Sequence, residues 1–236
     1  MKNKNKIGII GGGNLHHLGF LDKEKAKKIN TPYGEVVYFL IKNIPLILRH
    51  GLKRNIYPHQ INYKANIQFF KDFGVKNIYA FNSVGSLKKR FKPGVFLIPN
   101  DYINFDIISF CEKERRHVVP GLSLEIRNKF INFCQNLDLK FQKKGTYFQT
   151  KGPRFETKAE IKLIKNYADV VGMTMPKEAT LAKEMDLEYA ALCSLDNYAH
   201  GIIKRPLTQE KVEQNEQKIN KKIEKIIQEI LKSNLL

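Results

Sequence analysis

The chain has 236 residues, of which 42% are hydrophobic and 27% are charged, with 15 glycines and 9 prolines. This composition is globular and excludes a disordered chain, and the length predicts one sizeable domain over residues 1–236. The longest apolar stretches are far shorter than the roughly 20 residues that span a bilayer. The charged amino terminus is not followed by the pattern of a secretion signal. We therefore expect a cytoplasmic protein without a membrane segment.

The formal net charge of +18 comes from 41 Lys and Arg residues against 23 Asp and Glu residues. Such a surplus suits either nucleic acid or a smaller anionic substrate. The lysines are spread from Lys2 to Lys232 and are interleaved with acids instead of forming one stripe. This spread favours the smaller anion and makes nucleic-acid binding an unlikely alternative.

Three cysteines, Cys111, Cys134 and Cys193, are widely spaced and belong to no metal-binding pattern. Their odd number in a cytosolic chain favours reduced thiols. We expect neither a disulfide framework nor a metal site.

Apolar runs alternate with helical patterns along the chain. Strands are predicted at residues 7–10, 45–48, 77–81 and 189–193, and helices at residues 62–73, 158–167, 176–185 and 208–231. The last helix is amphipathic, and a long loop is expected over residues 105–120. Because continuous apolar strands belong to a sheet covered on both faces, we predict an α/β fold with three α/β/α layers and a mixed central sheet.

A glycine turn, Gly11 to Gly13, follows the first predicted strand. Backbone N–H groups in such a turn can close on a bound anion because no side chains intervene. A dinucleotide fingerprint needs a glycine where this chain has His16, and the phosphate-loop pattern ending in Gly-Lys-Ser/Thr is absent. Neither a Rossmann cofactor nor an ATPase of that type is expected.

Polar residues follow the other predicted strands. Arg49 and His50 come directly after residues 45–48, Asn82 and Ser83 after residues 77–81, and Thr174 after an apolar run at 170–173. Open sheets bind ligands at such strand ends, and arginine suits an oxyanion. Singly, each residue is more often a turn cap or a surface arginine. Together with the glycine turn they outline one anion pocket.

A series of short segments has a characteristic order along the chain. They are Ile-Gly-Ile-Ile-Gly-Gly (7–12), Thr-Pro-Tyr-Gly (31–34), Arg-His-Gly (49–51), residues 58–67, 82–87, 92–94 and 145–147, Gly-Pro-Arg-Phe-Glu-Thr (152–157) and Val-Gly-Met-Thr (171–174). In this order they resemble the purine nucleoside phosphorylase family, specifically its branch of 5'-methylthioadenosine and 5'-methylthioinosine phosphorylases. Segments 59–67 and 152–157 are the most specific.

The resemblance implies a phosphorylase-like fold and phosphorolysis in purine salvage. Inorganic phosphate attacks the anomeric carbon of a purine nucleoside and releases the base and a sugar 1-phosphate, with no metal or organic cofactor. By this resemblance, phosphate contacts Gly13, Asn14, Arg49, His50, Asn82, Ser83 and Thr174. Met173 is then expected against the ribose and Phe155 against the purine.

The residues Asp196 and Asn197 bear on the choice of base. A leaving purine needs a proton or hydrogen bond at N7, and the resemblance gives that function to this pair. Adenosine-type members of the branch carry Asp-x-Asp here, whereas 6-oxopurine members carry Asn. An asparagine amide can donate to O6 and accept from protonated N7. Alignment at Asn197 and Ala199 favours inosine, guanosine or 5'-methylthioinosine, while a slip of one residue would make Asp196 the contact.

Two segments depart from the family's pattern. The family usually has Ser or Thr and then Gly after its paired glycines, where this chain has Gly13 and Asn14, so one phosphate hydroxyl is missing. Either Asn14 or backbone N–H groups replace it, or phosphate binds weakly. The family's Val-Pro-Glu also becomes Met-Pro-Lys-Glu at residues 175–178. A catalytically weakened homologue is therefore an alternative.

His117 lies at about the place of a family histidine that a neighbouring subunit holds near the 5' group. The resemblance therefore implies a homotrimer or a hexamer. The choice between a 5'-methylthio and a 5'-hydroxyl group stays open, because a small apolar pocket discriminates by only ~1–3 kcal/mol. A 5'-methylthioadenosine phosphorylase is the second hypothesis. A nucleic-acid-binding protein and a nucleoside hydrolase are the others, and Arg49 with His50 argues against the hydrolase.

Overall fold

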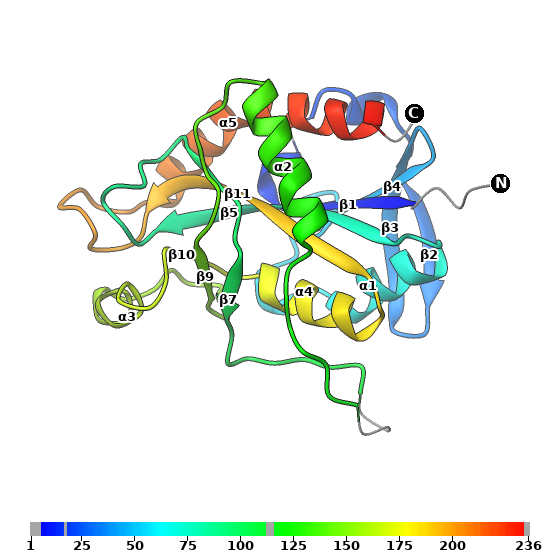
Figure 1. Cartoon of the computed structure of the whole chain (residues 1–236), viewed down its shortest axis with the longest axis horizontal. Helices are drawn as coiled ribbons and strands as arrows, with labels where there is room; N and C mark the ends of the chain where they lie inside the picture. The colour runs from blue at the N-terminus through cyan, green and yellow to red at the C-terminus, as the bar shows by residue number, and fades with distance from the viewer. Residues whose placement is uncertain (1–5, 17, 112–115, 234–236) are drawn as a thin grey trace.

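The computed structural model describes residues 6–16, 18–111 and 116–233. These residues form a mixed sheet of eleven strands with helices on both faces (Figure 1). The strands are β1 (Ile7–Gly11), β2 (Lys27–Thr31), β3 (Gly34–Ile41), β4 (Ile44–Leu48), β5 (Asn77–Ser86), β6 (Phe96–Leu97), β7 (Asp101–Ile103), β8 (Phe141–Gln142), β9 (Thr146–Gln149), β10 (Val170–Gly172) and β11 (Glu188–Tyr198). The helices are α1 (Tyr63–Asp72), α2 (Leu124–Asn136), α3 (Lys158–Ile164), α4 (Met175–Glu184) and α5 (Gln209–Ser233).

The central strands β4, β1, β5 and β11 are parallel neighbours. Their carboxyl ends therefore lie at one edge of the sheet, while β10 pairs with β5 in the antiparallel direction. Helices α1 and α4 bury side chains such as Phe70 and Leu181 against one face. Helices α2 and α5 bury Phe130 and Ile227 against the other. The predicted three-layer α/β/α fold with a mixed sheet is confirmed.

The apolar runs predicted as strands lie within β1, β4, β5 and β11, and the predicted helices correspond to α1, α3, α4 and α5. In the described parts of the predicted loop, residues 105–111 and 116–120, no helix or strand is present. The sequence analysis missed the β2–β3 hairpin and α2. Strand β2 is almost entirely exposed and therefore has no apolar pattern. Helix α2 buries Ile126, Phe130 and Cys134 at intervals of four residues, a helical period that the prediction overlooked.

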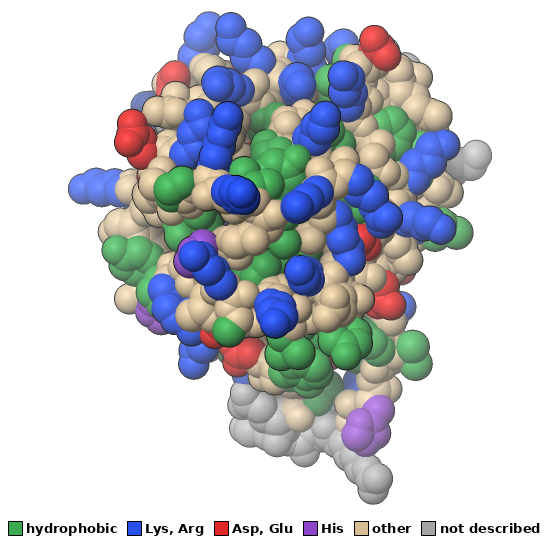
Figure 2. All heavy atoms as spheres, turned by 90° about the vertical axis from the view of Figure 1, so that its left-hand side faces the viewer, with side chains coloured by type: hydrophobic (Ala, Val, Ile, Leu, Met, Phe, Trp, Pro, Cys, Tyr) green, Lys and Arg blue, Asp and Glu red, His purple; other side chains and the backbone are tan. Residues whose placement is uncertain are grey.

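The surface is rich in basic side chains. Figure 2 looks onto the end of the molecule at which β5 and β11 terminate, and Lys and Arg side chains predominate there over Asp and Glu. They are scattered among hydrophobic side chains instead of forming one stripe. Among the helices of the described ranges, none is long and apolar enough to cross a membrane.

Candidate functional site

A cavity of about 530 Å³ opens at the carboxyl ends of the central strands. The glycine turn after β1, the segment after β4, the end of β5, the β10–α4 junction, the end of β11 and the first turns of α5 all contribute to its wall. The strand ends are joined by backbone bonds, because Arg49 N donates to Gly11 O at 2.9 Å and Gly12 N to Phe81 O at 3.3 Å. The parallel sheet thus brings together segments that are far apart in sequence.

Most of the residues predicted to bind phosphate meet at one end of this cavity. They are Gly13, Arg49, His50, Ser83 and Thr174. A Cβ added to Gly12 would lie 3.3 Å from Arg49 Nη1 and 3.5 Å from His50 Nε2, so the bare turn approaches both side chains closely. A backbone N–H group, an arginine and the Thr174 hydroxyl together form a donor set that suits an oxyanion.

Asn82 does not line the cavity but supports it. Its side chain is buried, and Nδ2 donates to Thr174 Oγ1 at 2.9 Å. Because the threonine oxygen accepts from Asn82, its own proton is available to a ligand in the cavity. Asn82 therefore orients a donor at the anion end without contacting the anion.

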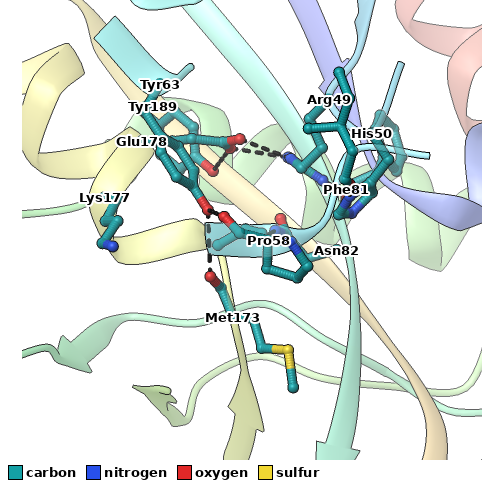
Figure 3. Close-up of polar contacts among 12 residues, drawn as sticks. Arg49, His50, Pro58, Tyr63, Phe81, Asn82, Met173, Lys177, Glu178 and Tyr189 are labelled. Atoms are coloured by element: carbon teal, nitrogen blue, oxygen red, sulfur yellow. Dashed lines mark hydrogen bonds and ion pairs between the residues drawn. The ribbon is translucent and has the colours of Figure 1, made fainter. Parts of the chain in front are cut away.

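Arg49 is held by a carboxylate that the sequence analysis did not identify as its partner. Arg49 Nε donates to Glu178 Oε1 at 2.7 Å and Nη2 donates to Oε2 at 2.8 Å, and both side chains are 0% exposed (Figure 3). Arg49 Nη1 donates to Phe81 O at 2.7 Å, and Tyr189 Oη donates to Glu178 Oε2 at 2.7 Å. Burial raises the pKa of Tyr189 well above its ordinary value, so its hydroxyl remains a donor. The altered segment 175–178 thus supplies the buried counter-ion that fixes Arg49.

His50 is neutral and has a defined tautomer. Its Nδ1 lies 2.8 Å from Ile56 O, and a carbonyl oxygen can only accept, so Nδ1 carries the proton. Burial, together with the positive charges of Arg49 and Arg54, lowers the pKa of His50 to about 4. At neutral pH its Nε2 is therefore an unprotonated acceptor beside the glycine turn.

The cavity wall also includes Phe155, Met173, Asn197 and Ala199 together with Gly85. A Cβ on Gly85 would lie 3.2 Å from Asn197 Nδ2, so the absence of a side chain there leaves room beside the amide. Asn197 Nδ2 donates to Tyr198 O at 2.9 Å. An amide and a half-exposed aromatic ring at one end of a cavity suit a planar heterocycle with polar edges.

A β-bulge separates the environments of Asp196 and Asn197. The pairing of β11 with β5 shifts between Leu195, opposite Val84, and Asn197, opposite Gly85. Asn197 lines the cavity, whereas Asp196 is 0% exposed, does not line it and accepts from Ser194 Oγ at 3.1 Å. Of the two candidates for the base contact, only Asn197 lines the cavity.

Asn14 is also turned away from the cavity. It is fully buried, and its Nδ2 donates to Ser194 Oγ at 3.2 Å, which places it in the same polar cluster as Asp196. The missing hydroxyl at the glycine turn is therefore not replaced by Asn14. His117, on the exposed surface, does not line the cavity of its own chain.

Burial raises the pKa of Asp196 to about 8, and the negative charge of Glu216 adds to this effect, while hydrogen bonds from Ser83 and Ser194 oppose it. An acid whose pKa rises on folding costs stability as the pH increases from its unfolded value of about 3.9 through its folded value. Asp196→Asn mimics the protonated form without that cost. We expect the variant to be more stable at pH 8, by up to about 5 kcal/mol, and the gain to vanish near pH 4.

Thermal unfolding of wild type and Asp196→Asn from pH 4 to pH 9 tests this expectation. Asp72→Asn, which changes an exposed acid at the end of α1, serves as the matched control. A gain that is the same at every pH, or a loss at pH 8, would show that Asp196 is ionised in the folded protein.

The sequence analysis missed the part of the wall that α5 supplies. These residues are Gln209, Val212, Glu213, Glu216 and Gln217, and Arg54, Tyr57 and Pro58 face the cavity from the segment after β4. The pattern of α5 predicted which side packs on the sheet, but not that its first turns reach the strand ends. In residues 6–16, 18–111 and 116–233, no group of three or more His, Cys, Asp or Glu side chains is placed to hold a metal ion.

Comparisons with known proteins agree with this arrangement. The family model of the phosphorylase superfamily matches residues 6–232. The chain is 40% identical to a probable S-methyl-5'-thioinosine phosphorylase of Methanocaldococcus jannaschii, over 95% of this chain and 91% of the relative. It is 36% identical to a probable 6-oxopurine nucleoside phosphorylase of Archaeoglobus fulgidus, over 96% of both chains. It is 34% identical to the S-methyl-5'-thioadenosine phosphorylase of Pyrococcus abyssi, over 95% of this chain and 93% of the relative.

Among solved structures, methylthioadenosine phosphorylase from Schistosoma mansoni in complex with adenine superposes with a TM-score of 0.82. The two chains are 23% identical, and the match covers 97% of this chain and 91% of the other, so this likeness concerns the fold. The family model and the curated relatives extend over nearly the whole sequence. The chain belongs to the phosphorylase superfamily.

Proposed function

We propose that this chain is a purine nucleoside phosphorylase of purine salvage with a preference for 6-oxopurine nucleosides. The observation that carries the proposal is a cavity whose wall contains both the glycine turn with Arg49 and the amide of Asn197. Inorganic phosphate is the co-substrate, and no metal or organic cofactor takes part. The reaction yields a free base and ribose 1-phosphate or 5-methylthioribose 1-phosphate.

The anion end would hold phosphate on one side of the sugar. The backbone N–H of Gly13, the Thr174 hydroxyl and the second N–H of Arg49 Nη1, whose first is bound to Phe81 O, would be the donors, with Ser83 beside them. As the bond from the anomeric carbon to the purine breaks, positive charge develops on the sugar. A fixed phosphate dianion stabilises that charge and attacks the carbon, as preorganised electrostatics should.

Asn197 would stabilise the leaving base. Its Nδ2 donates to O6 of a 6-oxopurine, and its Oδ1 accepts from N7 once N7 is protonated. Phe155 then packs on the purine and Met173 on the ribose. The 6-amino group of adenine would present a donor to the Asn197 donor, which is the reason for the 6-oxopurine preference.

We infer a homotrimer or hexamer, in the cytoplasm, with a partner completing the 5' end of the site. Phe105 is 84% exposed, and Val119, two residues after His117, is 82% exposed. Large apolar side chains with this exposure are typical of a surface that packs against another molecule. A second copy seated there would bury them and could bring His117 to a neighbouring cavity.

The alternative function is that of a 5'-methylthioadenosine phosphorylase, which the similarity to the S-methyl-5'-thioadenosine phosphorylase of Pyrococcus abyssi supports. The test is to incubate the protein with inosine, guanosine, 5'-methylthioinosine, adenosine and 5'-methylthioadenosine, with and without inorganic phosphate, and to quantify the released base. We expect hypoxanthine or guanine release that depends on phosphate.

The other outcomes separate the alternatives. Release of adenine would favour the function of a 5'-methylthioadenosine phosphorylase. Release of base in the absence of phosphate would indicate a hydrolase. If no base is released from any of these substrates, the result would support a catalytically weakened homologue.

A further inference from the structure

The space left by the bare Gly13 is filled by an ion pair. Arg54 Nη2 donates to Glu216 Oε2 at 2.9 Å, and the two side chains are 32% and 8% exposed. A Cβ placed on Gly13 would collide with Arg54 Nη2 and would lie 2.9 Å and 3.0 Å from the two oxygens of Glu216. The Arg54 guanidinium and the Glu216 carboxylate therefore pack directly against the glycine turn that forms the anion-binding part of the cavity.

Both members of the pair line the same cavity as Arg49 and His50. Arg49 is already balanced by Glu178 through two short hydrogen bonds, and His50 offers an unprotonated nitrogen. Neither of them brings an unbalanced positive charge to the anion end. Arg54 donates to Glu216 through one nitrogen, Nη2, and it lines the cavity. It is therefore the cation best placed to meet an incoming anion.

Glu216 holds a negative charge beside the glycine turn, where the proposed anion would bind. Its carboxylate lies against the glycine turn and accepts from an arginine, as one edge of a phosphate would. A dianionic phosphate and this carboxylate cannot both lie against one guanidinium without strong repulsion, because the interaction of like charges grows as they leave bulk water. Entry of phosphate therefore requires Arg54 to exchange one anion for the other.

We propose that Arg54 is a phosphate-binding residue and that Glu216 is its internal counter-ion, which inorganic phosphate displaces on binding. This proposal rests on the proposed function and specifies how this chain compensates for the missing hydroxyl at the glycine turn. Glu216 belongs to α5, whose first turns also line the cavity with Gln209 and Val212. Displacement of the Glu216 side chain by phosphate would therefore change the part of the cavity wall that α5 forms.

Two variants with opposite expected effects test the proposal. Calorimetric titration with inorganic phosphate, without nucleoside, should show Arg54→Ala binding phosphate at least about tenfold more weakly than wild type, the loss typical of a charge-assisted contact. Arg54→Lys keeps the charge and should fall in between. Glu216→Gln can still accept from Arg54 but carries no charge, so it should bind phosphate about threefold to tenfold more tightly.

The matched controls are Lys53→Ala and Glu210→Gln, which remove exposed charges next to Arg54 and on α5 from residues that do not line the cavity. Unchanged phosphate affinity in Arg54→Ala overturns the proposal. Weaker binding in Glu216→Gln overturns it as well, since Glu216 would then only position Arg54.

A second measurement separates this proposal from the proposed function. If wild type cleaves nucleosides with phosphate while Arg54→Ala keeps its phosphate affinity, only the present inference fails. If the two variants change phosphate affinity in the expected directions while no nucleoside is cleaved, the phosphate site stands and the proposed function fails.

Discussion

Replacing Glu178 by alanine is expected to lower the free energy of unfolding by about 3–5 kcal/mol, because it leaves the Arg49 guanidinium buried without a counter-ion. Both side chains are fully buried, and Glu178 accepts from Arg49 through two oxygens and from Tyr189 through one of them. For a chain of this length the loss corresponds to a decrease in Tm of roughly 10 °C. Thermal unfolding monitored by circular dichroism measures it, with the exposed Glu188→Ala as the matched control.

A double variant distinguishes the buried charge from simple loss of packing. Arg49→Met with Glu178→Leu removes both charges and keeps most of the volume, and replacements of this kind restore or even increase stability. We expect the double variant to regain most of the lost Tm but to respond only weakly to phosphate. A double variant as unstable as Glu178→Ala would mean that the pair acts through shape and not through charge.

The strand-end residues Arg49, His50 and Thr174 could be predicted to meet because parallel strands end at one edge of a sheet. The partner of Arg49 could not be predicted. Glu178 is 129 positions away in the sequence and lies on a helix with no pattern that marks one acid as buried. Pairs of this kind depend on how α4 packs against β11 and β5, which periodicity does not specify.

The fate of neighbouring residues was equally dependent on local geometry. The sequence favoured Asn197 over Asp196 as the base contact, but a slip of one residue would have exchanged them. In the structure the bulge in β11 places Asp196 in the polar interior and Asn197 in the wall of the cavity. A bulge inserts one residue without any strong sequence signal in this stretch. Likewise, the amphipathic pattern of α5 predicted its buried side but not the contact of Glu216 with Arg54.

The largest change in substrate preference is expected from Asn197→Asp. A carboxylate at this position accepts from the 6-amino group of adenine and from protonated N7, but it can no longer donate to O6 of a 6-oxopurine. Opposing two acceptors in a closed site costs about 3–4 kcal/mol, so kcat/KM for the 6-oxopurine nucleoside should fall by about 10²–10³-fold. In the same variant, kcat/KM for the corresponding adenine nucleoside should increase.

Paired kinetics with inosine and adenosine, or with their 5'-methylthio forms, at saturating phosphate measure the ratio directly. Asp196→Asn is the matched control, since it alters an adjacent carboxylate that does not line the cavity and should leave the ratio of the two kcat/KM values unchanged. Asn197→Ala should slow both substrates, because neither then has a partner at N7. If the ratio of the two kcat/KM values changes in Asp196→Asn but not in Asn197→Asp, the base contacts Asp196. That result would reverse the assignment of the purine contact.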